Sequence, residues 1–190
     1  MTPPRPAPAA ETPVALTIDG HPVEVPAGTT IHGAAEQASI ETPTLCWAEN
    51  LTPVNVCRVC VVEVEGSRTL VPACARPVVE GMVVATDSER VRHSRRMVLE
   101  FLGSGVDLSQ ADDLTRWIDH YGADPDRYDL PDRPAARINE EPKVQDDLYI
   151  RDYDRCVLCY KCVEACGDDA QHTYAIAVAG RGFDARISTE

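Results

Sequence analysis

The sequence predicts an α+β protein that begins with a β-grasp domain and ends in a small cysteine-rich segment. Two observations lead to this prediction. Residues 14–39 read as a two-stranded hairpin followed by a short helix, which is how a β-grasp begins. All eight cysteines fall into two sets of four, one inside the predicted β-grasp and one near the C-terminal end.

Each element is predicted from a local pattern. Strands are predicted where apolar residues alternate, and Asp19-Gly20 is a typical hairpin turn. Thr29 or Thr30 is suited to cap the first helix, and the stretch 103–105 (Gly-Ser-Gly) to end the second. The predicted elements are strands at 14–18, 22–25, 59–65, 69–72 and 82–86, and helices at 31–39, 89–102 and 111–121.

These elements divide the chain into four parts. A Pro- and Ala-rich tail at 1–13 is predicted to be disordered, and residues 14–88 to form the β-grasp domain. Residues 89–147 hold the long helix and a spacer rich in Asp, Pro and Arg, which we expect to have little core of its own. Residues 148–190 form the final segment, which carries the second cysteine set.

The composition argues against a nucleic-acid-binding protein. The chain has 31 acidic and 18 basic residues and a formal net charge of -13, so a basic surface of the kind that nucleic acids require is not expected. We interpret the excess of acidic residues as a means of keeping the protein soluble. The helix at 89–102 nevertheless gathers four arginines, which we interpret as a solvated face that could also contact an acidic partner: Arg90, Arg92, Arg95 and Arg96.

The sequence indicates a cytoplasmic protein, at most attached to a membrane through a larger complex. The first residues contain no apolar core of a signal peptide, and no apolar run is long enough to cross a membrane. Cysteines in a chain without an export signal favour metal binding over disulfides. No nucleophile–base pair or carboxylate constellation indicates a catalytic site, and we interpret Asp152, Asp154, Asp168 and Asp169 as solvated loop charges.

The first cysteine set is Cys46, Cys57, Cys60 and Cys74, in the pattern C-x10-C-x2-C-x13-C. Plant-type ferredoxins bind a [2Fe–2S] cluster with C-x4-C-x2-C and a distant fourth cysteine. The C-x2-C pair and the distant cysteine fit that pattern, whereas the first gap is ten residues instead of four. A zinc site is the alternative, although zinc ribbons usually contain two C-x2-C pairs and this set has one.

The sequence around this set resembles a known family. The segment TLCWAENLTPVNVCRVCVVEVEG and the LTIDGHPVEVPAGTTIHGAAEQASIETPTLC before it are similar to the N-terminal [2Fe–2S] ferredoxin-like domain of one group of proteins. That group comprises the G subunit of NADH-quinone oxidoreductase, the NAD-dependent formate dehydrogenase alpha subunit and the diaphorase subunit of NAD-linked hydrogenases. The long first gap occurs in this family, so the resemblance implies that the four cysteines hold a [2Fe–2S] cluster. Asn55-Val56 departs from the family, which usually has a glycine-containing pair there.

The resemblance also implies a site that this chain lacks. The family continues with a [4Fe–4S] site held by one histidine and three cysteines, shortly after a helix like 89–102. In this chain the stretch GSGVDLSQADDLTRW contains neither histidine nor cysteine. His93 and His120 lie on either side of it, with no cysteine near either. We therefore expect the scaffold of this His-(Cys)3 module to persist as a metal-free remnant.

The second cysteine set is Cys156, Cys159, Cys162 and Cys166, in the pattern C-x2-C-x2-C-x3-C. This run is typical of bacterial ferredoxins, in which three cysteines bind one [4Fe–4S] cluster and the fourth reaches another. The surrounding segment, with its AGRGFD stretch, resembles the [4Fe–4S] region of the same family and is nearest to the formate dehydrogenase branch. No second run follows, so three possibilities stay open. Cys166 closes the cluster, a non-cysteine or partner-chain ligand does so, or the chain is a fragment or a degenerate subunit.

The sequence therefore predicts an electron-transfer iron–sulfur subunit without catalytic residues of its own. The resemblance implies two partners, a flavin-containing NADH-oxidising subunit and a molybdoenzyme, hydrogenase or quinone-reductase subunit. Without a G-x-G-x-x-G motif, the chain is not expected to bind NAD itself. The alternative is a structural or assembly subunit, because loss of the His-(Cys)3 site removes a stepping stone for electrons. The clusters would then serve the fold and docking.

Overall fold

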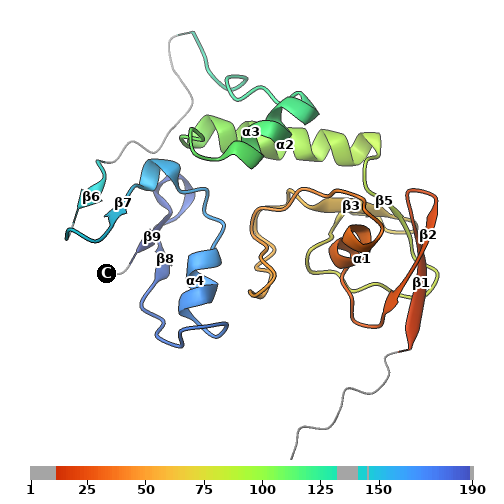
Figure 1. Ribbon diagram of the computed structural model, residues 1–190. Coiled ribbons are helices and arrows are strands. Elements are labelled where there is room, and N and C mark those ends of the chain that lie inside the picture. The colour runs from red at the N-terminus through yellow and green to blue at the C-terminus, as the bar shows by residue number, and fades with distance from the viewer. Residues whose placement is uncertain (1–11, 132–140, 145, 189–190) are drawn as a thin grey trace, which may run out of the picture.

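The computed structural model describes residues 12–131, 141–144 and 146–188 (Figure 1). Apart from its last two residues, the tail predicted to be disordered lies outside the described residues. The N-terminal part forms a sheet with one helix beside it, and the C-terminal segment forms a separate group of small elements. Two further helices, α2 and α3, run along the top of Figure 1 above these parts.

The N-terminal sheet has five strands in the order β2-β1-β5-β3-β4. β1 and β5 run parallel, whereas the other neighbouring strands are antiparallel, as a β-grasp requires. The hairpin turns at Asp19 and Gly20, which both have positive φ (50° and 82°), as the sequence predicts. The strands are β1 (Pro13–Ile18), β2 (His21–Pro26), β3 (Val61–Val64), β4 (Val71–Pro72) and β5 (Val83–Ala85).

Helix α1 (Ile31–Gln37) packs its apolar residues into the core of this sheet. Thr30 is the cap, and its hydroxyl accepts a hydrogen bond from the Gly33 N–H at 3.2 Å. The core consists almost entirely of Val, Ala, Ile and Leu side chains, as the low aromatic content requires, together with two of the cysteines. Those cysteines, Cys60 and Cys74, are therefore positioned by the same packing that holds α1 on the sheet.

Helix α2 (Glu89–Gly105) is longer than predicted. We expected it to end at Leu102, but Gly103-Ser104-Gly105 continues the helix. The glycine at 103 has a packing role, since a Cβ atom there would lie only 2.8 Å from Cγ of Pro125. This glycine therefore allows a close approach between α2 and the chain that follows α3 (Asp112–Tyr121).

The spacer after α2 has a core of its own, contrary to our expectation. Leu114, Trp117 and Tyr121 of α3 are buried against Leu99 of α2. Half-buried side chains from both flanking parts pack against this cluster, among them Leu45 and Val157. Leu45 directly precedes Cys46, and Val157 directly follows Cys156. The helical pair formed by α2 and α3 therefore connects the two cysteine sets.

The C-terminal segment consists of two small hairpins and a short helix. Within the described residues, no helix combines the length and hydropathy needed to cross a bilayer. The elements are β6 (Lys143–Val144), β7 (Ile150–Arg151), the 3-10 turn Tyr153–Arg155, α4 (Lys161–Cys166), β8 (Ala177–Ala179), the 3-10 turn Gly182–Asp184 and β9 (Arg186–Ser188).

Candidate iron–sulfur sites

The first cysteine set comes together from three loops. Cys46 follows α1, Cys57 and Cys60 precede β3, and Cys74 follows β4. Cys46, Cys60 and Cys74 are only 1–2% exposed, whereas Cys57 is partly exposed. The core therefore shields three of the cysteines from solvent, whereas Cys57 lies at the partly exposed edge of the set.

The four thiols lie close enough to hydrogen-bond with one another. Cys46 contacts both Cys57 and Cys74, and Cys60 contacts Cys74. These contacts lower the pKa of Cys46 to about 2 and that of Cys60 to about 7, and they raise the pKa values of Cys57 and Cys74. The thiols share protons because four thiolates at this separation repel one another unless a cation lies between them. Iron supplies that positive charge, so the donor set fits a [2Fe–2S] cluster.

The contacts group the thiols in pairs. Cys46 with Cys57 forms one pair and Cys60 with Cys74 the other, joined by the contact between Cys46 and Cys74. A two-iron cluster with four cysteine ligands takes two thiolates on each iron, and this pairing suits that arrangement. Across the ranges that the structure describes, no three Cys, His, Asp or Glu side chains surround a position for a single metal ion.

Asn55 and Arg58 give the loop around Cys57 its shape. Both residues adopt left-handed backbone conformations, with φ of 63° and 58°. Asparagine enters this region more readily than most residues with a side chain, which explains how Asn55 stands where the family has a glycine-containing pair. The loop also turns the N–H groups of Val56 and Cys57 toward the Cys46 sulfur, and such hydrogen bonds help to set the potential of a bound cluster.

Arg95 lies beneath this loop, and our interpretation of it as a solvated residue was wrong. Its side chain is 1% exposed. The guanidinium donates to the Val59 carbonyl from Nε at 3.1 Å, to the Val61 carbonyl from Nη2 at 2.9 Å and to the Tyr121 hydroxyl from Nη1 at 2.5 Å. Arg95 thus ties α2 to the backbone around Cys60 and to α3. The signal was present in the sequence, because Arg95 lies four residues from both Val91 and Leu99, on the apolar face of the helix.

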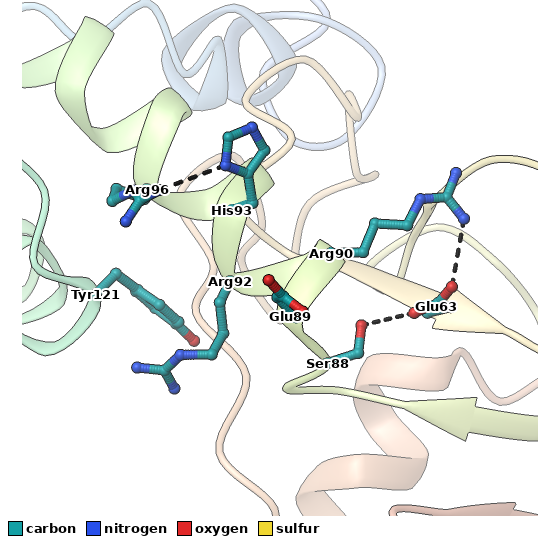
Figure 2. A pocket seen from close by; sticks show the side chains of 8 residues that line it. All are labelled: Glu63, Ser88, Glu89, Arg90, Arg92, His93, Arg96 and Tyr121. Atoms are coloured by element: carbon teal, nitrogen blue, oxygen red, sulfur yellow. Dashed lines mark hydrogen bonds and ion pairs between the residues drawn. The ribbon is translucent and has the colours of Figure 1, made fainter.

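The other arginines of α2 line an open hollow of about 870 Å³ (Figure 2). Arg90 and Arg92 form ion pairs with carboxylates at 3.3 and 2.8 Å, and their side chains stay 48% and 43% exposed. Their interpretation as a solvated face therefore holds. Arg96 contacts Nδ1 of His93 at 3.4 Å, so this histidine belongs to the surface of α2. The lining residues are Glu63, Ser88, Glu89, Arg90, Arg92, His93, Arg96 and Tyr121.

In the second set, Cys156 and Cys162 share one cavity and lie near Cys159. Cys156 and Cys162 line a mostly apolar cavity of about 430 Å³ together with Tyr153, Ile176 and Ile187. Burial raises the pKa values of both thiols, and the nearby Cys159 raises them further. A group of three thiols beside a cavity of this kind fits a [4Fe–4S] cluster, whose iron would remove this mutual repulsion.

Cys166 has different surroundings. It is buried at the end of α4, where its sulfur contacts the Thr173 hydroxyl at 3.1 Å and accepts a hydrogen bond from the Ala175 N–H at 3.2 Å. These bonds, led by the one with Thr173, lower the pKa of Cys166. The structure therefore divides the second set into a group of three and a fourth cysteine held by its own hydrogen bonds.

Three of the aspartates that we interpreted as solvated loop charges make structural contacts, and one of them, Asp168, accepts a hydrogen bond from the Tyr174 hydroxyl. Asp152 caps the turn before Cys156 and pairs with Arg155 at 3.1 Å. Asp169 accepts two hydrogen bonds from Thr52, which lies in the loop between Cys46 and Cys57. Sequence patterns could not reveal the contact between Asp169 and Thr52, since its partners are far apart in the chain.

Comparison with domain families agrees with two cluster sites. The family of 2Fe-2S iron-sulfur cluster binding domains matches residues 11–89, and the family of 4Fe-4S binding domains matches residues 149–171. The chain therefore carries domains of the kinds that bind a [2Fe–2S] and a [4Fe–4S] cluster. Each cysteine set lies inside one of the two matches.

The chain has homologues among subunits of redox complexes, as its sequence predicts. It is 37% identical to the NADP-reducing hydrogenase subunit HndD of Solidesulfovibrio fructosivorans, over 91% of this chain and 31% of that protein. It is 35% identical to the mitochondrial NADH-ubiquinone oxidoreductase 78 kDa subunit of Candida albicans, over 93% of this chain and 25% of that protein. The chain spans less than a third of the length of these relatives.

A solved structure shows the same arrangement of elements. A chain from the crystal structure of an NAD+-reducing [NiFe]-hydrogenase in the H2-reduced state superposes with a TM-score of 0.76 and 26% sequence identity. The match covers 94% of this chain and 74% of that chain. The likeness thus extends through the helical pair as well as the two cysteine-bearing parts.

Proposed function

We propose that this chain, an iron–sulfur protein homologous to subunits of NADH- and NADPH-linked oxidoreductases, relays electrons between two partner proteins. The donor is a flavin-containing subunit that oxidises NADH, and the acceptor is a hydrogenase, quinone-reductase or molybdoenzyme subunit. Bound clusters supply one-electron redox centres. The residues of the chain bind these centres, keep water from them and fix their positions.

The buried group of four hydrogen-bonded thiols is the observation that carries this proposal. We assign Cys46, Cys57, Cys60 and Cys74 as the ligands of the [2Fe–2S] cluster. The loop N–H groups that face the Cys46 sulfur, and Arg95 beneath the loop, place positive charge near the site. Positive charge stabilises the reduced form of a cluster, so we expect both to raise its reduction potential.

We assign Cys156, Cys159 and Cys162 as three ligands of the [4Fe–4S] cluster. Cys166 is turned toward Thr173 and the backbone after α4, which argues against its closing the same cluster. Of the three possibilities that the sequence left open, we therefore favour a fourth ligand from a non-cysteine group or from another chain.

The helical pair of α2 and α3 lies in the part of the chain where the family has its His-(Cys)3 site. We propose that residues 89–147 are a His-(Cys)3 module without its metal, between a [2Fe–2S] domain at 14–88 and a [4Fe–4S] segment at 148–190. The apolar cluster of this region receives Leu45 from one side and Val157 from the other. Apolar packing therefore connects the two cysteine-bearing parts in this chain.

Iron and acid-labile sulfide analysis, combined with EPR of the anaerobic, dithionite-reduced protein, tests the proposal. We expect one [2Fe–2S] and one [4Fe–4S] signal per chain. Cys57→Ser should remove only the first signal, Cys159→Ser only the second, and Cys166→Ser neither. With NADH and the flavin subunit, both signals should appear without dithionite. Clusters that assemble but stay oxidised under those conditions would refute the relay and favour the structural or assembly role.

A further inference from the structure

We propose that the long gap between Cys46 and Cys57 is a docking loop, and that its contact with Asp169 positions the two cysteine sets relative to each other. This inference builds on the proposed electron relay, because it concerns how the chain fixes the separation of its redox sites. The starting observation is the gap itself, which has ten residues where plant-type ferredoxins have four. The additional residues lie in a segment that the cluster ligands alone do not require.

The loop folds back on itself before it reaches the C-terminal segment. Ala48 and Leu51 form an isolated β-bridge, and the Leu51 N–H donates to the Ala48 carbonyl at 3.2 Å. This tight turn leads directly to Thr52 at the outside of the loop. In Figure 1 the loop, in orange, extends from the β-grasp toward the group of elements that contains α4.

Thr52 then binds both oxygens of one carboxylate. Its N–H donates to Oδ2 of Asp169 at 2.6 Å, and its hydroxyl donates to Oδ1 at 2.9 Å. The two residues are 117 positions apart in the sequence, so the contact has no local origin. A carboxylate that accepts two hydrogen bonds from one residue restricts both the distance and the orientation of the loop.

The contact joins the two cysteine-bearing parts directly. Thr52 lies five residues before Cys57, and Asp169 lies three residues after Cys166. Within the described residues, further connections run through α2 and α3: the N–H of Asp107, just after α2, donates to the Asp154 carbonyl at 2.7 Å, and apolar side chains meet in the core of the two helices. The Thr52–Asp169 contact is therefore a second point of attachment between the β-grasp and the C-terminal segment. Two points of attachment restrict rotation of one part relative to the other.

The separation of two redox centres controls the rate of electron transfer between them, because tunnelling falls steeply with distance. Partly exposed hydrogen bonds are individually modest contributors. Losing both should shift the balance between attached and separated arrangements roughly tenfold toward the separated one. The fold of each part should remain, since both residues lie outside the cores.

The test compares four variants of the full chain with its clusters assembled. Asp169→Ala removes both acceptors, and Thr52→Val removes only the hydroxyl, whereas Thr52→Ser keeps it. Asp168→Ala is the matched control, because the neighbouring Asp168 accepts from Tyr174 within its own segment. The readouts are hydrogen exchange of the Thr52 amide, and the magnetic coupling between the two clusters in EPR of the dithionite-reduced protein.

We expect Asp169→Ala to speed exchange of the Thr52 amide roughly tenfold and to weaken the coupling between the clusters. Thr52→Val should have a smaller effect of the same sign, Thr52→Ser should preserve the coupling, and Asp168→Ala should change neither readout. The individual midpoint potentials should stay the same. Wild-type exchange and coupling in Asp169→Ala, or equal changes in Asp168→Ala, would overturn the inference.

Two further outcomes separate this inference from the proposed relay. If NADH and the flavin subunit fail to reduce the clusters, the relay fails, yet exchange and coupling after dithionite reduction still decide the positioning role. If Asp169→Ala does not assemble its clusters, Thr52→Val decides, since it removes one hydrogen bond and preserves the shape of the side chain. Unchanged coupling in an assembled Thr52→Val variant would then refute the inference.

Discussion

Replacement of Arg95 by methionine should destabilise the protein severely. Methionine fills a similar volume but has no hydrogen-bond donor, so the carbonyls of Val59 and Val61 and the hydroxyl of Tyr121 lose their partner. Hydrogen bonds from a charged donor contribute about 1.5–3 kcal/mol each. Burying a methionine costs less free energy than burying a guanidinium, which offsets part of this loss. We expect a net loss of about 3–5 kcal/mol, because three buried polar groups are left without their donor and each such group costs about 1–3 kcal/mol.

Anaerobic urea denaturation, followed by circular dichroism and by the visible absorption of the clusters, measures this loss. Arg90→Met is the matched control, because Arg90 lies on the same helix in an exposed ion pair that should contribute about 1 kcal/mol or less. Arg95→Lys should fall between the two, since an ammonium keeps the charge but cannot reach three acceptors in the same geometry. The [2Fe–2S] absorption should bleach early in Arg95→Met, because Val59 lies between Cys57 and Cys60. An Arg95→Met midpoint equal to that of Arg90→Met would refute the reasoning.

Three other perturbations have clear expected outcomes. Gly103→Ala places a Cβ against Pro125 and should lower the melting temperature, at a cost of about 1–3 kcal/mol in folding free energy. In the control variant Gly105→Ala the new Cβ meets nothing within 4 Å, so the melting temperature should rise slightly. Equal effects of the two variants would argue against the contact between Gly103 and Pro125. Burial lowers the pKa of His32 below 6.5 despite the nearby Glu36, so the unfolded chain binds more protons than the folded chain below that pH. Stability should therefore fall by up to about 1.4 kcal/mol per pH unit as the pH drops through 6.5 toward the lower pKa of the folded state, and His32→Gln should flatten this slope in urea titrations. Removal of iron with a chelator should loosen the β-grasp core, seen as faster amide exchange next to the buried cysteines; unchanged exchange would show that the thiols pack as well without metal.

The local elements of the β-grasp could be predicted because their signals are local. Asp19-Gly20 marks the hairpin turn by its backbone preference, and Thr30 caps α1 through a hydrogen bond to a residue three positions away. The assignment of residues to strands rests on alternation, which needs no knowledge of the partner strand. Predicted and observed boundaries differ by one or two residues at most strand ends, where pairing with a neighbour decides the last residue.

The contacts between parts could not be predicted in the same way. Arg95 was interpreted as exposed because arginine usually is, and only the loop at Val59 and the hydroxyl of Tyr121 provide what a buried guanidinium needs. No sequence pattern near Asp169 indicates its contact, because its partner Thr52 lies 117 residues earlier in the chain. A sequence pattern specifies the chemistry of a residue, whereas these roles depend on which distant groups the fold brings beside it.

The division of the second cysteine set bears on the whole proposal. In the sequence, Cys166 is the fourth member of a regular run, and regularity favours four equivalent ligands. In the structure its sulfur is satisfied by Thr173 and by the backbone of Ala175, so recruiting it to the cluster of the other three would break these bonds. Cys166→Ser should therefore spare the [4Fe–4S] signal while it weakens the packing after α4, close to Asp169. If Cys166→Ser instead abolishes that signal, Cys166 is a ligand, α4 must move when the cluster binds, and the docking contact just beyond it would have to move as well.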